Sequence, residues 1–330
     1  MAGCSDSRLV GIARLAAASE LLEAKRQVQY FELPSRSFIT RCESKRVPFR
    51  WTVNPYRGCE FGCRYCYARY THEFMELRDG MDFEKKIYAK LWSAEAFRRD
   101  LAKVPREESI AIGTATDPYQ PAERRYGVMR KMLEVLAGGR GYRIWITTKS
   151  DLVARDADLL AAISRHNQIT VHLTVTTTDA ALARLLEPYA PRPDRRLAAV
   201  KTLRGAGVAA SVFSSPILPL LNDSEESLDA VAAAAKEAGA ISWGGNVLFL
   251  KDCARAVFFP FLEQHFPHLL QRYRERFEAS AYLRGSYPEK IEQRIARIRE
   301  KHGLGRRTEQ YRPEDWYEDE QLSLFTRFTA

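Results

Sequence analysis

The residues best suited to do chemistry are three cysteines, Cys59, Cys63 and Cys66, which follow a C-x₃-C-x₂-C spacing. Thiolates at this spacing can bind three irons of one [4Fe–4S] cluster, since each thiolate takes a different corner of the cubane. Gly58 and Gly62 give the loop the backbone freedom to wrap closely. No fourth cysteine follows nearby, so one iron would keep an open position for a substrate.

A structural zinc site is the alternative, because zinc also takes thiolate and imidazole ligands. His72, Cys42 or Cys253 would have to complete it. Zinc sites usually pair two C-x₂-C units, whereas this chain has one such pair, followed directly by the aromatic Tyr67. The spacing therefore favours the iron–sulfur cluster, and a non-catalytic zinc-bearing scaffold is kept as a competing interpretation.

Polar side chains stand at the predicted ends of three strands. Thr116 and Asp117 end the second strand, Lys149 ends the third and Thr176 ends the fourth. An ammonium group at a strand end in a concave site is a ready partner for an anion, which makes Lys149 a candidate ligand. The plainer alternatives are a solvated lysine, a polar turn and the ordinary β-propensity of threonine. We interpret His172, which lies within an apolar strand, as structural.

These residues need a scaffold, and from residue 51 onward β-branched runs alternate with helical windows in the manner of βα units. Such units favour parallel strands joined by right-handed crossovers, and six are too few for a closed eight-stranded barrel. No glycine-rich phosphate loop follows the first strand, which argues against a dinucleotide fold. We predict an α/β fold, a partial (β/α)₆ TIM-type barrel of parallel strands. The predicted strands are residues 51–54, 109–116, 143–148, 169–176, 208–217 and 241–250, with helices over 123–136, 157–163, 195–203 and 223–238 and in the stretch from the cysteines to residue 97.

The segments on either side of the barrel are predicted to differ from it. Residues 1–50 read as an N-terminal extension with a helical stretch over 12–28. Residues 51–252 form the barrel, and Asp223 with Glu226 and Gly239 mark the start and stop of its last helix. A helical C-terminal segment is expected over 253–302 and a flexible tail over 303–330.

Composition sets limits on function. The chain has 330 residues, of which 45% are hydrophobic and 28% charged, and a formal net charge of +9. No apolar run approaches the length of about 20 residues that spans a bilayer, and no secretory signal begins the chain. We therefore expect a soluble cytoplasmic protein without a membrane partner. The positive charge is consistent with a polyanionic partner such as DNA, although net charge alone does not identify one.

The cysteine motif and its setting resemble the radical-SAM superfamily, in which such a loop follows the first strand of a partial barrel. The sequences Gly-Thr-Ala-Thr-Asp-Pro-Tyr-Gln-Pro-Ala-Glu at 113–123 and Ile-Thr-Thr-Lys-Ser at 146–150 look like the spore photoproduct lyase-like branch, also called DNA-repair photolyase-like. The resemblance implies a radical-SAM enzyme whose [4Fe–4S] cluster binds S-adenosylmethionine and cleaves it reductively to a 5′-deoxyadenosyl radical. It also implies an external electron donor such as flavodoxin or ferredoxin.

The resemblance gives roles to the site residues. Tyr65, before the last cysteine, would lie near the adenine, and Lys149 would pair with the methionine carboxylate. Thr116 and Asp117 would accept from the methionine ammonium group or contact the ribose, and Thr176 would contact the ribose.

One position departs from the family pattern. The lyase has a cysteine, which returns a hydrogen atom to the product radical, where this chain has Ala115. Cys253 is a candidate substitute, although an incidental thiol is the plainer interpretation. The substrate is therefore open: damaged or modified nucleic acid is one interpretation, and a peptide, a tRNA or a small molecule is the other.

The tail holds a second resemblance. Gln321, Leu322, Leu324 and Phe325 belong to the pentapeptide Gln-Leu-Ser-Leu-Phe, which is similar to the peptide by which bacterial polymerases and repair proteins dock on the replicative sliding clamp. An extended segment with apolar anchors behind an acidic run is a common form of docking peptide. The alternative is an amphipathic end that packs on the barrel. The clamp interpretation would supply a reason to expect work on DNA.

Overall fold

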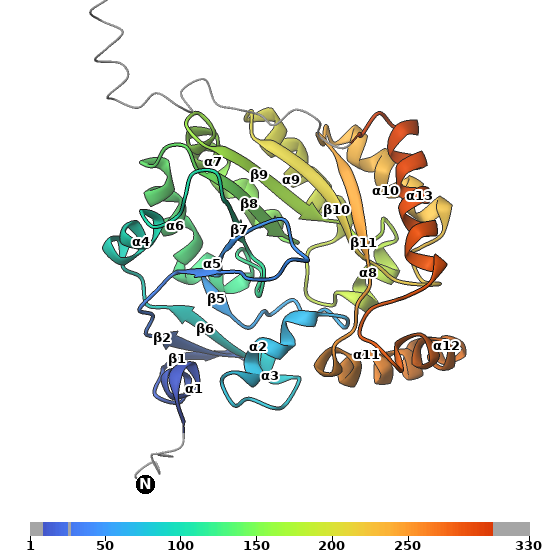
Figure 1. The fold of residues 1–330 in the computed structure, drawn as a ribbon, viewed down its shortest axis with the longest axis horizontal. Helices are drawn as coiled ribbons and strands as arrows, with labels where there is room; N and C mark the ends of the chain where they lie inside the picture. The colour runs from blue at the N-terminus through green and yellow to red at the C-terminus, as the bar shows by residue number, and fades with distance from the viewer. Residues whose placement is uncertain (1–8, 26–27, 306–330) are drawn as a thin grey trace, which may run out of the picture.

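A seven-stranded sheet forms the centre of the computed structural model, which describes residues 9–25 and 28–305 (Figure 1). Its order is β11-β10-β9-β8-β7-β4-β3, and all neighbours pair in parallel except β3 and β4. The predicted α/β fold of six parallel strands is confirmed, and the sheet is open rather than closed. The strands are β3 (Ile39–Arg41), β4 (Trp51–Val53), β7 (Ser109–Ile112), β8 (Arg143–Thr148), β9 (Gln168–Thr174), β10 (Ala209–Ile217) and β11 (Trp243–Val247).

Helices cover the outer side of this sheet (Figure 1). The main apolar core lies between the sheet and these helices, and Ile146 and Val171 of the strands and Leu133 and Val200 of the helices are completely buried in it. The covering elements are α4 (Ala94–Leu101), α5 (Pro121–Tyr126), α6 (Val128–Ala137), the 3₁₀ helix η2 (Asp151–Asp156), α7 (Ala157–Ser164), α9 (Pro193–Gly205), α10 (Glu225–Glu237) and α13 (Ser286–Lys301). The short helix α8 (Ala180–Leu186) instead packs with the cysteine loop.

A second, four-stranded sheet corrects the prediction for the N-terminal extension. The helix expected over residues 12–28 is only α1 (Gly11–Ala17); β1 (Glu20–Lys25) and β2 (Val28–Leu33) follow it. β2 pairs in parallel with β6 (Lys86–Lys90), which in turn pairs with β5 (Tyr56–Arg57). Pairing with a strand distant in sequence overrides the local helical preference of this Leu- and Glu-containing segment. The segment is thus part of the sheet from which the cysteine loop departs.

The C-terminal helices bring a second apolar core to the cysteine loop. α11 (Asp252–His265) and α12 (Pro267–Phe277) confirm the helical expectation for this segment. Buried side chains of these helices, such as Phe258 and Phe277, belong to the same cluster as Cys59 and Tyr65. The cysteine loop is followed by η1 (Tyr67–Arg69), α2 (Tyr70–Glu73) and α3 (Asp82–Lys85).

Several element ends differ from the prediction. The N-cap of α10 is Ser224, whose hydroxyl accepts from the Ser227 N–H, while Asp223 accepts from the Leu220 N–H instead. β7 and β9 end before residues 116 and 176, which therefore lie on the loops that follow them. Residues 321–325 of the tail lie outside the described residues. Within the described ranges, every helix is too short or too polar to cross a membrane.

Candidate cluster and cofactor site

The cysteine loop begins where β5 ends, and its first glycine is required there. Gly58 has a φ of +79°, and a Cβ at this position would lie 2.7 Å from the Lys86 carbonyl oxygen and 2.8 Å from that of Phe83. The Cys59 N–H donates to the same Phe83 carbonyl at 2.8 Å. The loop is therefore held directly against the second sheet, with no room for a side chain between them.

The three cysteines lie within electrostatic reach of one another. Cys59 and Cys63 are each only 8% exposed, and Cys66 is half-buried. Burial, followed by the nearby Asp117 and Cys63, raises the pKa of the Cys59 thiol. Burial also raises the pKa of Cys63 to about 12, against the opposing effect of the Lys149 ammonium. Three free thiols near one another, with the Lys149 cation close to Cys63, fit the charge and ligand needs of an iron–sulfur cluster, whose binding deprotonates them.

The contacts of His72 weaken the zinc alternative. Its Nε2 lies 3.0 Å from the Lys86 carbonyl oxygen, and its ring packs edge-on against Phe83 and Tyr88. His72, on α2, is thus a structural residue that packs against the second sheet. In the part of the chain that the structure describes, no three His, Cys, Asp or Glu side chains are arranged to hold a single ion. A cubane differs from a zinc ion in this respect, because its thiolates bind separate irons.

Thr116 positions the cysteine loop from the end of β7. Its hydroxyl donates to the Gly58 carbonyl oxygen at 2.5 Å. Gln120 donates to the same carbonyl at 2.9 Å and accepts from the Glu60 N–H at 3.0 Å. Residues of the segment 113–123 therefore bind the backbone on both sides of Cys59, at Gly58 and at Glu60.

Asp117 joins the end of β7 to the end of β8. Its carboxylate accepts from the Thr148 hydroxyl and the Lys149 N–H, both at 2.7 Å, and from the Tyr119 N–H at 2.9 Å. Burial raises the pKa of Asp117 above its usual value, although these three donors oppose the rise. Because its oxygens already have protein donors, a positioning role suits Asp117 better than direct contact with a cofactor.

The structure brings Tyr65, Lys149 and Thr176 together around Glu187, a residue that the sequence analysis missed. The Tyr65 hydroxyl donates to Glu187, as does the Thr176 hydroxyl at 3.1 Å. The Lys149 Nζ lies 5.7 Å from the centroid of the Tyr65 ring. These residues come from the cysteine loop and from the loops after β8 and β9, so the grouping arises only in the fold.

Arg196, also missed, holds Glu187 in place. Its Nη2 lies 2.5 Å from Glu187 Oε2, and its Nη1 donates to the Thr174 carbonyl oxygen at 3.0 Å. Both members of the pair are 1% exposed. Burial raises the pKa of Glu187, but Arg196 and then Lys149 lower it more, so that the net shift is downward and the carboxylate is charged. The only sequence signal was a Glu and an Arg flanking a proline-rich turn.

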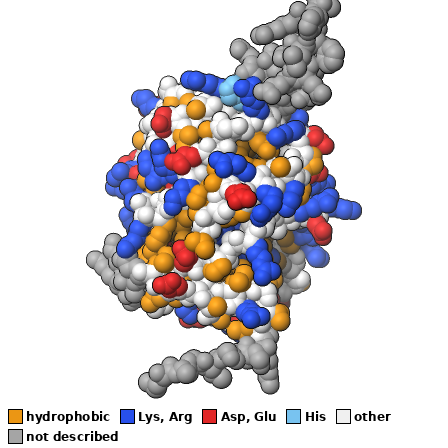
Figure 2. Space-filling model, turned by 90° about the vertical axis from the view of Figure 1, so that its left-hand side faces the viewer, with side chains coloured by type: hydrophobic (Ala, Val, Ile, Leu, Met, Phe, Trp, Pro, Cys, Tyr) orange, Lys and Arg blue, Asp and Glu red, His pale blue; other side chains and the backbone are white. Residues whose placement is uncertain are grey.

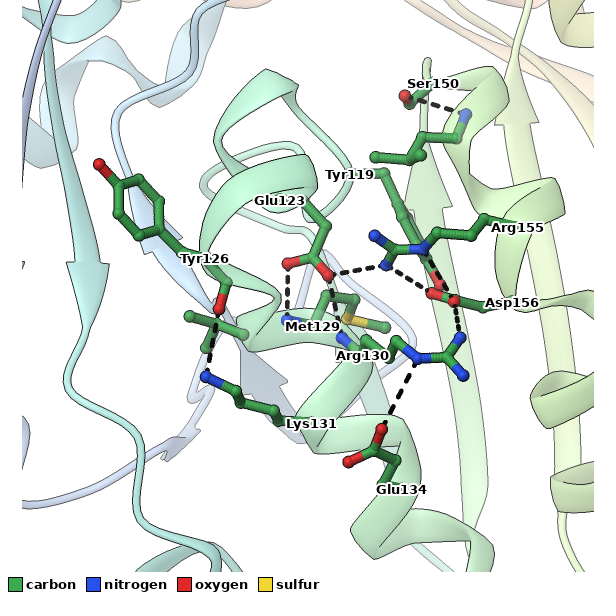
Figure 3. Close-up of polar contacts among 12 residues, drawn as sticks. Tyr119, Glu123, Tyr126, Met129, Arg130, Lys131, Glu134, Ser150, Arg155 and Asp156 are labelled. Carbon is green, nitrogen blue, oxygen red and sulfur yellow. Dashed lines mark hydrogen bonds and ion pairs between the residues drawn. The ribbon is translucent and has the colours of Figure 1, made fainter.

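Glu123, the last residue of segment 113–123, fixes the helices behind the site (Figure 3). Its carboxylate accepts from the Met129 N–H at 2.8 Å and the Arg130 N–H at 3.1 Å, and so caps the first turn of α6. It also accepts from the Tyr56 hydroxyl of β5 at 2.5 Å and from Arg155 at 2.9 Å. Glu123 thereby ties the second sheet to the barrel helices.

The remaining residues considered in the sequence analysis lie in different parts of the structure. Cys253, at the start of α11, places its Sγ 4.0 Å from the Tyr67 carbonyl oxygen, within electrostatic reach of Cys66. The Ala115 N–H donates to the Asn54 side chain at 2.8 Å, which fixes this part of the loop after β7. His172 lies on β9, and its ring centroid is 6.3 Å from that of Phe213.

Comparisons with known proteins show the family to which this chain belongs. The family model described as Radical SAM superfamily matches residues 53–249. An uncharacterized protein of Mycobacterium tuberculosis is 36% identical over 279 residues, which cover 84% of this chain and 82% of the relative. An uncharacterized protein of Methanocaldococcus jannaschii is 31% identical over 180 residues, which cover 53% of this chain and 63% of the relative. A mutant spore photoproduct lyase with bound AdoMet and dinucleoside spore photoproduct has a similar structure, with a TM-score of 0.62 at 16% identity over 82% of this chain and 79% of that one. The chain therefore belongs to the radical SAM superfamily and is a radical-SAM enzyme.

Proposed function

We propose that this enzyme binds a [4Fe–4S] cluster through Cys59, Cys63 and Cys66 and uses it to cleave S-adenosylmethionine. The observation that carries the proposal is the group of three free thiols that lie within electrostatic reach of one another, with the Lys149 ammonium close to Cys63. When bound, the cluster supplies the electron that breaks a carbon–sulfur bond of S-adenosylmethionine. A one-electron donor such as flavodoxin or ferredoxin would reduce it, in the cytoplasm, where thiols stay reduced.

The protein's own residues bind and orient the cofactor in this proposal. Lys149 pairs with the methionine carboxylate, and Tyr65 presents its ring to the adenine while Glu187 fixes its hydroxyl. Thr176 lies on the ribose side, with its hydroxyl already directed to Glu187. Thr116 holds the cysteine loop in position, and Asp117 holds the backbone of Lys149.

For the substrate, we propose damaged or modified nucleic acid. The formal charge of +9 and the fold shared with an enzyme crystallised with a dinucleoside photoproduct support this choice. Ala115 removes the lyase's own thiol, so Cys253, next to Tyr67, is the candidate hydrogen donor. A peptide, a tRNA or a small molecule is the competing substrate class.

The test uses the reconstituted, reduced enzyme with S-adenosylmethionine and DNA made from deuterated nucleosides. We expect deuterium in the 5′-deoxyadenosine when the DNA has been irradiated and none with unlabelled DNA, because hydrogen abstraction moves substrate hydrogen to the 5′-carbon. If 5′-deoxyadenosine forms but never carries deuterium with any DNA, the proposal that DNA is the substrate is refuted, whereas the proposal of S-adenosylmethionine cleavage is unaffected. Absence of deoxyadenosine in every arm would contradict the radical chemistry itself.

A further inference from the structure

Tyr189 is an exposed aromatic residue that covers the cysteine loop from outside. Its ring is 66% exposed, yet one side of the ring lies against Gly62, the residue before Cys63. A Cβ at Gly62 would lie 3.0 Å from the Cδ2 and 3.3 Å from the Cε2 of Tyr189. At this point the ring of Tyr189 is the layer between the loop backbone and solvent.

Two backbone hydrogen bonds hold the residues around Tyr189 on the cysteine loop. The Tyr189 N–H donates to the Phe61 carbonyl oxygen at 3.3 Å, and the Arg64 N–H donates to the Leu186 carbonyl oxygen at 2.9 Å. These bonds lie on either side of Cys63 along the loop. A molecule that contacts Tyr189 would therefore be held at a defined distance from this cysteine.

Exposed arginines lie on the same segment as Tyr189. The Arg184 guanidinium donates to the carbonyl oxygen of Pro188, the residue before Tyr189, and the Arg184 side chain is exposed. Arg192, three residues after Tyr189, is also exposed and pairs with the exposed Asp194 at 2.9 Å. The exposed side chains around Tyr189 on this segment thus carry more positive than negative charge.

Glu84 also lies near this place, but its charge is compensated inside the protein. Its Oε2 would lie 3.2 Å from a Cβ at Gly62, and it pairs with the Nη2 of Arg69 at 2.8 Å. Both members of this pair are buried. A partner that approaches from solvent therefore meets Tyr189 and the exposed arginines first.

We propose that Tyr189, Arg184 and Arg192, here called the Tyr189 patch, dock the acidic one-electron carrier that reduces the cluster. This inference rests on the proposed function and names the place where its reductant binds. One electron leaves the reduced carrier, which is oxidised, and enters the cluster, which is reduced. Electron transfer slows steeply with distance, so the carrier has to bind close to the cysteines, and Tyr189 lies directly on the cysteine loop.

The composition of the Tyr189 patch suits such a partner. Complexes between electron-transfer proteins are weak and have small interfaces, and Tyr and Arg are the residues that most often supply the binding energy of an interface. Positive charge at the rim speeds the encounter with an acidic protein.

The test measures binding of a purified oxidised flavodoxin, an acidic carrier, to the anaerobically reconstituted enzyme by surface plasmon resonance. No S-adenosylmethionine and no reductant are present. We expect binding that weakens as salt is raised, because exposed charges are screened. Arg184→Gln/Arg192→Gln should weaken binding about three- to tenfold, and Tyr189→Ser should weaken it about fivefold or more.

A matched control makes the same change in charge at another place. Arg98→Gln/Arg99→Gln removes two exposed cations of α4, which lies on the face in Figure 2, where Lys and Arg side chains are scattered among acidic and hydrophobic ones. This variant should bind flavodoxin as the unaltered enzyme does. An equal loss in both double variants, or full binding by Tyr189→Ser, would overturn the proposal. Self-association of the enzyme that Tyr189→Ser abolishes would assign the patch to a second copy of the chain and overturn it as well.

Formation of 5′-deoxyadenosine gives a second readout. With reduced flavodoxin, variants of the Tyr189 patch should form it more slowly than the unaltered enzyme. With dithionite, a small reductant that needs no docking surface, they should form it at the unaltered rate. An equal loss with dithionite would show that the patch shapes the cysteine loop itself, which would overturn the docking role. If even the unaltered enzyme forms no 5′-deoxyadenosine, the proposed function is contradicted, whereas the binding result still decides the docking surface.

Discussion

The Glu187–Arg196 ion pair is the most important site contact that no sequence pattern predicted. Both side chains are 1% exposed, and Glu187 also accepts from Tyr65 and Thr176. A buried ion pair is weak support for stability as such, but removing one partner leaves the other charge buried and uncompensated. The pair therefore fixes the geometry of the tyrosine beside the last cysteine.

Arg196→Met should lower the free energy of unfolding by about 3–5 kcal/mol, because the Glu187 carboxylate then has no cation at 2.5 Å. Urea unfolding followed by circular dichroism measures this change. The neighbouring Arg195→Met is the matched control: Arg195 makes an exposed ion pair with Asp151 and should cost at most about 1 kcal/mol. Equal costs for the two variants would contradict the role assigned to the buried pair.

Lys149→Met should weaken S-adenosylmethionine binding about 10- to 100-fold while the iron content stays unchanged, since a charge-assisted bond to a carboxylate contributes about 1.5–3 kcal/mol. Equilibrium dialysis with the reconstituted enzyme measures the binding, and iron analysis measures the cluster. Lys131→Met, at an exposed position of α6, controls for the loss of one charge. A Lys149 variant that binds the cofactor normally would rule out this contact.

At the scale of elements, α4 is fastened to the segment before β3 by one carboxylate. Asp100 accepts from the Phe38 N–H and the Ser37 hydroxyl, both at 2.9 Å. Burial tends to raise the pKa of Asp100, but these donors and Lys103 lower it more, so that the net shift is downward. The unfolded chain therefore binds this proton at a higher pH than the folded one.

It follows that the contribution of Asp100 is fully present above its unfolded pKa and is lost as the pH falls toward its lower, folded value. Asp100→Asn should lose about 1–2 kcal/mol at pH 7 and show a smaller further loss between pH 5 and pH 3 than the unaltered chain. Urea unfolding at a series of pH values measures both effects. Parallel curves for the two proteins would show that the Asp100 pKa does not differ between the folded and unfolded states.

Sequence patterns predict those elements whose partners are neighbours along the chain. The six parallel strands follow from apolar runs between helical windows, each packed on the next unit. β1 and β2 were missed although they pair with each other, because their segment also fits a helical period; β6 was missed because its partner β2 is more than fifty residues away. The same holds for the site: the cysteine spacing is local, whereas Glu187 becomes a site residue only when three loops converge.

At the scale of the whole molecule, the cysteine loop joins parts of the fold that lie far apart along the chain. It shares an apolar core with α11, and Thr116 and Gln120 bind it from the segment after β7. Its Gly58 also lies directly against Lys86 of β6 in the second sheet. Disturbing any one of these parts should therefore affect the loop.

The intact chain should be retained by immobilised bacterial sliding clamp, and a chain lacking residues 321–325 should not, if the pentapeptide is a docking segment. The matched control carries the same five residues in scrambled order, which keeps length and composition. Retention is measured in a pull-down with purified proteins. Equal retention of all three chains would refute the clamp interpretation.

The most direct test of the central claim is anaerobic reconstitution followed by metal analysis and a cleavage assay. We predict about four irons and four sulfides per chain, and formation of 5′-deoxyadenosine from S-adenosylmethionine on reduction. Cys63→Ala should lose both, and Cys42→Ala should keep both, since Cys42 lies outside the cysteine loop. One zinc per chain with no sulfide, or a complete cluster that yields no 5′-deoxyadenosine, would contradict the account.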